Sequence, residues 1–283
     1  YLEGRFGRAE KSATRASLAP EYAGLAALIG ARSAHRLQQN RRRDEWLNAA
    51  GEHSALRTAR LMTTVELLAE DNRQIDDALA AISELNSHGI KHAQALRLAL
   101  RVHQSARNWS EVLRLVRLLD KHHALHPTLS RRLRDMAYEA LLPKAAEDPE
   151  SLKKLWANVP AADRVSAGVA AVAANAFMKV GRQQEAADII EKALSVQWDA
   201  RLLRAYRHCA APEGSATLLA QIEHGEHWSR ERPNDPELAL VLGALCFKQK
   251  LWGKAQRHLE QALADATERA VAQEAHLRLA QMH

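Results

Sequence analysis

The chain contains 14 histidines, and three pairs have a spacing that would place two imidazoles on one face of a helix. These pairs are His88/His92, His122/His126 and His224/His227. Two imidazoles on one face can share a metal ion or face a haem iron. The first two pairs each cross a predicted helix end. The third is the best metal candidate, but the simpler interpretation is that these histidines are exposed or cap helices, so we expect no metal site.

Motifs of catalysis are missing from the sequence. It contains no Gly-rich phosphate loop, no G-x-S-x-G and no H-E-x-x-H. The carboxylates follow solvated helix patterns, with no isolated pair inside an apolar run. Cys209 and Cys246 lack C-x-x-C spacing and are interpreted as small buried apolar residues. The sequence therefore predicts a protein that is not an enzyme and holds no cofactor.

The charge balance is basic, with 40 Lys and Arg against 34 Asp and Glu and a net charge of +6. Arginines cluster at 41–43 and at 131, 132 and 134, but aromatic residues make up only 5% of the chain. Elsewhere the charges alternate in sign, which is typical of a solvated helix face. We therefore expect no nucleic-acid partner. The alternative, binding of single-stranded RNA, would show a steep dependence on salt.

Apolar residues recur three and four apart along nearly the whole chain, as at Ile75, Leu79, Ile82 and Leu85. Each such stripe is one face of an amphipathic helix that must pack against a neighbour. Short breaks between the stripes make consecutive helices antiparallel. Together with only 12 Gly and 8 Pro, the pattern predicts about fifteen helices and no strand.

Several breaks carry residues that start helices. Proline follows His126, Asp148 and Asp235, at or near predicted helix starts. Asn108 or Ser110 is available as the cap of another helix.

The helical stripes repeat. Ala78 and Val112 occupy equivalent positions 34 residues apart, and Ala186 and Ala255 are 69 apart, close to two such intervals. A period near 34 with two helices per unit is typical of a solenoid. The small residues resemble those of the tetratricopeptide repeat. In that repeat, small residues at these positions let the paired helices approach closely. One match is Leu242-Gly243, Ala255, Leu259 and Ala262, with Trp252 in the turn, and a second is Ala174, Gly181, Ala186, Ile190 and Ala193.

This resemblance implies an all-α fold, a right-handed superhelical solenoid of antiparallel helix pairs that spans 1–283 as a single domain. Residues 4–16 match only the second helix of a repeat, so we expect the chain to be a fragment that begins there. An irregular section is expected over 129–163. The alternative is an irregular all-α domain with coincidental spacing.

In stacked helix pairs, the first helices line a concave surface. Transferring the repeat's usual groove-facing positions to this chain gives Arg97 and Arg101, then Asn175 and Lys179, then Lys248. Such a basic groove would favour an acidic peptide, a C-terminal carboxylate or porphyrin propionates. The alternative is that these are ordinary solvated side chains. Arg131 and Arg134 are further candidates of unknown orientation. The tryptophans near helix junctions are interpreted as packing residues, namely Trp46, Trp109, Trp156, Trp198, Trp228 and Trp252.

A narrower resemblance covers most of the chain. Residues 2–11 (L-E-G-R-F-G-R-A-E-K), 152–156 (L-K-K-L-W), 197–203 and 242–263 are similar to the bacterial HemY family. That resemblance implies a scaffold without catalytic activity of its own, associated with late protohaem synthesis, whose protein partners are enzymes of that process. The alternative that it leaves open is direct binding of haem or a porphyrin.

The same resemblance implies a tether in the bacterial inner membrane through two N-terminal spanning helices that are absent here. The longest uncharged run, 165–178, is too short to span a bilayer. The chain begins with Tyr1 rather than Met, so we expect that an upstream segment has been removed. A basic region after the anchor favours the cytoplasmic face.

Overall fold

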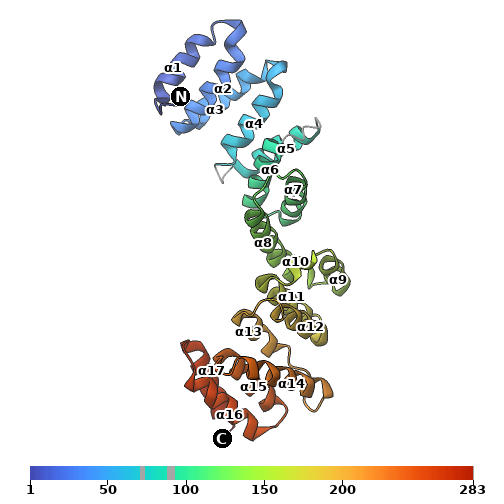
Figure 1. The fold of residues 1–283 in the computed structure, drawn as a ribbon. Coiled ribbons are helices and arrows are strands. Elements are labelled where there is room, and N and C mark those ends of the chain that lie inside the picture. Colours follow the sequence, from blue (N-terminus) through green and yellow to red (C-terminus); the bar gives the residue numbers. More distant parts are fainter. Residues whose placement is uncertain (71–73, 88–92, 283) are drawn as a thin grey trace. The chain divides into compact units, whose positions relative to one another are not determined.

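The computed structural model describes residues 1–70, 74–87 and 93–282, and every regular element within these ranges is a helix (Figure 1). The ranges contain seventeen α-helices and one 3-10 helix, close to the fifteen expected. The predicted all-α fold is therefore confirmed for these ranges. The pair His88/His92 lies outside the described residues.

The chain divides into two compact units, Tyr1–Leu133 and Arg134–His283. Each unit is built from helices that pack against their neighbours in sequence. The expectation that residues 1–283 form one continuous right-handed solenoid, beginning in the second helix of a repeat, stays a prediction.

In the first unit, three helices pack in series, α2 against α4 and α4 against α6. Each of them also packs against the helix that follows it, which gives the pairs α2/α3, α4/α5 and α6/α7. This is the arrangement expected of stacked helix pairs. The elements are α1 (Phe6–Ala16), α2 (Pro20–Arg36), α3 (Asn40–Gly51), the 3-10 helix η1 (Ser54–Leu56), α4 (Arg57–Leu68), α5 (Ile75–Ser87), α6 (Ala93–Ser105), α7 (Trp109–Lys121) and the beginning of α8 (Pro127–Ala145).

The second unit repeats the arrangement. Helices α11, α13, α15 and α17 pack in series as first helices, and α12 and α16 each pack between two of them in sequence. Helix α14 packs against α15. The elements are α9 (Pro149–Ala157), α10 (Ala161–Arg164), α11 (Ala167–Lys179), α12 (Gln183–Leu194), α13 (Ala200–His208), α14 (Ala216–Glu231), α15 (Pro236–Lys248), α16 (Trp252–Ala264) and α17 (Arg269–Ala280).

The section 129–163, expected to be irregular, is helical but uneven. Helix α8 has 19 residues, α9 has 9 and α10 has 4, whereas α15 and α16 of the best repeat match have 13 each. Two of its three prolines, Pro149 and Pro160, fall at the starts of the short helices, where a missing N–H is tolerated, whereas Pro143 lies inside α8.

The three prolines predicted at helix starts, Pro127, Pro149 and Pro236, each begin a helix. The Asp148 carboxylate accepts hydrogen bonds from the N–H groups of Glu150 and Ser151, and Asp235 accepts one from Leu238. Asn108 does occupy the cap position of α7, but its side chain makes no cap hydrogen bond, and Ser110 lies inside that helix. Neither side chain therefore serves as the cap expected there.

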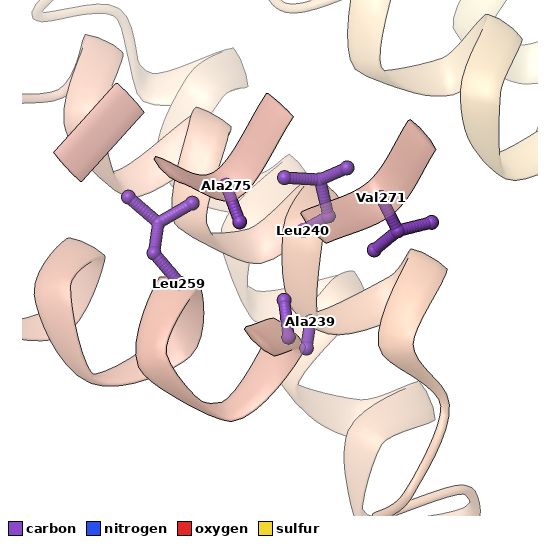
Figure 2. Close-up of a cluster of buried hydrophobic side chains, with 6 residues drawn as sticks. Ala239, Leu240, Leu259, Val271 and Ala275 are labelled. Carbon is purple, nitrogen blue, oxygen red and sulfur yellow. The ribbon is translucent and has the colours of Figure 1, made fainter. Parts of the chain in front are cut away.

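The core of the second unit shows why small residues recur. A Cβ atom built on Gly243 of α15 would lie 2.6 Å from Cδ2 of Leu259 in α16, so only a glycine permits this approach. Ala255 and Ala262 are also buried in α16, as the repeat pattern predicts. Next to them, α15, α16 and α17 enclose a cluster of aliphatic side chains (Figure 2), namely Ala239, Leu240, Leu259, Ala262, Val271 and Ala275.

Candidate binding grooves

A groove in the first unit holds the first pair of predicted arginines. Arg97 and Arg101 lie on successive turns of α6 and line a cavity of about 390 Å³. Arg97 is engaged in the fold, since its Nε and Nη2 donate hydrogen bonds to the Ala124 carbonyl oxygen at 3.1 and 2.7 Å. Arg101 is exposed and has no carboxylate partner among the described residues. The other lining residues are Leu100, Gln104, Ala124, Leu125, His126, Leu129 and Leu133.

A second groove lies in the second unit, where Lys248 at the end of α15 lines a cavity of about 460 Å³. The Lys248 ammonium donates a hydrogen bond to the carbonyl oxygen of Ala210, 2.8 Å away, and its side chain stays exposed. We call this cavity the α13/α15 groove. Its lining residues are Arg207, His208, Ala210, Glu213, Ala244, Phe247, Lys248, Lys250, Trp252 and Arg278.

The α13/α15 groove is strongly basic. Two of its cations have acidic partners, because Lys250 pairs with Glu213 and the Arg278 Nε lies 2.9 Å from Oε1 of Glu274. Arg207 has no ion pair within the described part of the chain, and its buried Nε makes no hydrogen bond. Burial lowers the pKa of Arg207, which marks it as a desolvated cation.

Sequence reasoning missed Arg207 and His208. Helix α13 has only 9 residues and lies outside both repeat matches, 174–193 and 242–262, so the pattern predicts no groove-facing position on it. The available signal was the spacing of Arg204, Arg207 and His208, three and four apart on one helix face. Burial and the neighbouring Arg207 and Arg278 cations lower the pKa of His208, so its imidazole is neutral at pH 7.

The five predicted groove residues lie in separate places. Arg97 and Arg101 share the groove of the first unit, and Lys248 lines the α13/α15 groove. Asn175 and Lys179 are exposed on α11 and do not line that groove. That these residues bind a partner stays a prediction.

The histidine pair on α14 does not converge on one site. The His224 Nδ1 lies 3.1 Å from Oε2 of Glu191, and its ring stacks on Trp228. His227 lies 3.6 Å from Oε1 of Glu231. In the described ranges, no group of three or more His, Cys, Asp or Glu side chains is placed to hold a metal ion.

The tryptophans near helix junctions mostly pack as interpreted. Trp198 and Trp228 meet edge to face, with ring centroids 5.8 Å apart, and the Trp198 Nε1 donates a hydrogen bond to Asp235. Trp252 differs, because it contacts Phe247 and yet leaves 49% of its surface exposed in the α13/α15 groove.

The arginine clusters are largely paired. Arg41 lies 3.3 Å from Glu45 and Arg42 lies 3.0 Å from Glu10. The Arg43 side chain is fully buried and its Nε donates a hydrogen bond to Asp44. In the second unit, the Arg134 Nε donates to Asp163 at 2.8 Å. These clusters therefore present less positive charge to solvent than the sequence suggests.

The two cysteines are buried free thiols, as interpreted from the sequence. Burial raises the pKa of Cys209 to about 12 and that of Cys246 to about 11. A thiol that stays protonated at neutral pH is a poor nucleophile, so neither cysteine is a candidate for covalent catalysis.

Comparisons with known proteins add little to this geometry. No family model matches the chain, and none of the curated proteins is similar to it, so the resemblance to the HemY family stays a prediction. Among solved structures, a tetratricopeptide repeat protein from Parabacteroides merdae is 13% identical with a TM-score of 0.37, covering 90% of this chain and 98% of that one. A likeness at this level carries no argument, so the fold rests on the helix packing described above. None of the described helices is long and apolar enough to cross a membrane.

Proposed function

We propose that this chain is a non-catalytic scaffold that binds a partner protein through an acidic segment carrying a large apolar side chain. The observation that carries the proposal is the α13/α15 groove. There the exposed Lys248 and the half-buried Arg207 lie beside the Phe247–Trp252 pair.

Each part of the α13/α15 groove has a matching part in such a segment. A carboxylate accepts charge-assisted hydrogen bonds from Arg207 and Lys248, which are stronger than those between neutral groups. The contact with Arg207 should contribute most to binding, because the Arg207 Nε is already desolvated and has no hydrogen-bond partner in the described structure. The exposed face of Trp252 offers an apolar surface next to the charges, where an aliphatic side chain can bury area.

The groove of the first unit has a similar chemical character. Arg101 projects beside Leu100, Leu129 and Leu133, and none of the described residues that line the cavity is acidic. A second acidic and apolar segment of the same partner is the ligand that this groove favours.

The test is a titration with a fluorescently labelled synthetic peptide that ends in Leu-Asp-Asp, against the same peptide ending in Leu-Asn-Asn. We expect Lys248→Glu to weaken binding of the acidic peptide by about tenfold or more, since one charge-assisted contact becomes repulsive. Arg269→Glu is the matched control, because Arg269 is equally exposed but lies outside the α13/α15 groove. Equal binding of the two peptides, or equal loss in the two variants, would overturn the proposal.

The process in which the scaffold acts is a further part of the proposal. The resemblance of residues 2–11, 152–156, 197–203 and 242–263 to the HemY family supports an association with late protohaem synthesis. It also supports a tether in the bacterial inner membrane, with this domain on the cytoplasmic face. Enzymes of late haem synthesis are then the expected protein partners.

A second candidate function is direct binding of haem or a porphyrin, favoured by the exposed His208. Its neutral imidazole keeps a lone pair for an iron, while Lys248 and Arg207 lie in the same α13/α15 groove as cations for propionate groups. His224, the earlier candidate, is held by Glu191 instead.

A haem titration of the purified chain distinguishes this second candidate. A saturable shift of the Soret band that is lost in His208→Ala and kept in His224→Ala would support it. The absence of a saturable shift, or equal loss in both variants, would exclude it.

A further inference from the structure

A third cavity differs in character from the two grooves. It lies between α14 and α16, has a volume of about 310 Å³, and is lined entirely by polar side chains. Glu226, Ser229 and Arg230 come from α14, and Lys254, Arg257 and His258 come from α16. On both helices the three positions are spaced i, i+3 and i+4, so each helix presents one face to the cavity. Because no aliphatic or aromatic hydrocarbon side chain lines it, this cavity suits a small polar ligand.

The charges of the α14/α16 cavity select an anion. The Lys254 ammonium donates a hydrogen bond to Oε1 of Glu226 at 2.8 Å, so these two charges offset each other. Arg230 and Arg257 are exposed, and neither has an acidic partner in the part of the chain that the structure describes. The lining therefore carries a net excess of two positive charges, both on guanidinium groups.

His258 gives a second and independent indication of a ligand. The residue is only 5% exposed, and neither ring nitrogen has a hydrogen-bond partner among the described atoms, although it lines a polar cavity. Buried polar groups in folded proteins are almost always hydrogen-bonded. Burial and the nearby Arg257 lower the pKa of His258, so the ring is neutral at pH 7 and offers one N–H donor and one acceptor.

We propose that the α14/α16 cavity binds a phosphate group, with the Arg230 and Arg257 guanidinium groups on its oxygens and His258 and Ser229 completing the site. Guanidinium groups match tetrahedral oxyanions with paired N–H donors, which an ammonium cannot do. A phosphate that keeps one proton can also donate it to the acceptor nitrogen of His258. This site is separate from the α13/α15 groove and does not depend on the proposed protein partner.

Calorimetric titration of the purified chain with inorganic phosphate, in low-salt buffer at pH 7, tests the proposal. We expect saturable binding at one site. Arg257→Gln and Arg230→Gln should each weaken it by about tenfold or more, because a charge-assisted contact is lost. Arg269→Gln makes the same change in net charge away from the cavity and should leave the affinity nearly unchanged. NMR signals of the His258 ring should shift with the same dissociation constant.

A second arm identifies the source of the phosphate group. Vesicles of phosphatidylcholine that contain phosphatidic acid present a phosphate monoester as a lipid headgroup, and vesicles of phosphatidylcholine alone are the control. Arg257-dependent binding to the vesicles with phosphatidic acid that exceeds binding of inorganic phosphate assigns the site to a headgroup, and the reverse order assigns it to a soluble phosphate. Binding that does not saturate, an unmoved His258 signal, or equal loss in Arg257→Gln and Arg269→Gln would overturn the proposal.

Discussion

Gly243 shows how one residue sets the distance between two helices. In Gly243→Ala, the new methyl group would collide with the Leu259 side chain, which is itself fully buried. We expect the substitution to lower the free energy of unfolding by about 1–3 kcal/mol, the usual cost of overpacking. Gly253→Ala is the matched control, because nothing lies within 4 Å of its Cβ position in α16. There alanine should be neutral or stabilising by up to about 1 kcal/mol. Urea unfolding measures the free energy of unfolding of both variants. Equal changes in the two would contradict the close contact between α15 and α16 at Gly243.

Three histidines with lowered pKa values make stability depend on pH. Burial lowers the pKa of His103, His208 and His258 in the folded protein. Each takes up a proton on unfolding once the pH falls below the unfolded value of about 6.5. The stability that they contribute is therefore present above that pH and is lost as the pH falls through the folded pKa. We expect the free energy of unfolding to decrease between about pH 7.5 and 5.5.

Urea unfolding at several pH values measures this slope, and His258→Gln should make it shallower. Paired carboxylates act in a separate range. Hydrogen bonds from Ser151, Arg201 and Lys254 lower the pKa values of Asp148, Asp199 and Glu226, so their contribution is lost only below about pH 4.5. A stability that stays level or rises as the pH falls from 7.5 to 5.5 would contradict the assignment of these three histidines as neutral in the folded protein.

Among the helices, Asp235 links the start of α15 to Trp198, which lies just before α13. Its Oδ1 accepts a hydrogen bond from the Leu238 N–H at 3.0 Å, and its Oδ2 accepts one from Trp198 at 2.7 Å. Asp235→Ala removes both, and we expect a loss of about 2 kcal/mol in the free energy of unfolding. Asn234→Ala is the control, because the adjacent Asn234 side chain is exposed. Thermal or urea unfolding of the two variants compares them, and a change of less than about 0.5 kcal/mol in Asp235→Ala would contradict the role of this cap.

The elements could largely be predicted from sequence because their signals are local. The apolar spacing from Ile75 to Leu85 and the prolines at 127, 149 and 236 specify helices and their starts within a few residues, and the structure places helices there. The cap of α7 could not be predicted, because a cap residue such as Asn108 satisfies the backbone only when its side chain is oriented towards it.

The candidate grooves were predictable only in part. Lys248 follows from a clear repeat match, whereas Arg207 and His208 lie on a helix outside both repeat matches. The α14/α16 cavity lies between two helices, and sequence spacing alone cannot show which side chains on two helices face each other.

Across the chain as a whole, the net charge is +6, and the cations divide into those paired with carboxylates and those that are not. Many arginines, such as Arg32 and Arg42, are bound to carboxylates. By contrast, Arg101, Arg207 and Lys248 face cavities and have no acidic partner among the residues that the structure describes. Free cations in concave places attract acidic partners and speed their association, an effect that salt screens. We therefore expect these cavities to bind acidic partners.

Photo-crosslinking in cells that produce the full protein tests this claim most directly. A photoreactive residue in place of Lys248 or Arg101 should capture one partner protein, through a segment rich in Asp and Glu, while the same residue at the exposed Gln256 of α16 should not. Identification of that partner as an enzyme of late haem synthesis would support the proposed association with that process. A different partner would contradict that association. Capture from Gln256 as efficient as from Lys248, or no capture from either groove, would contradict the account.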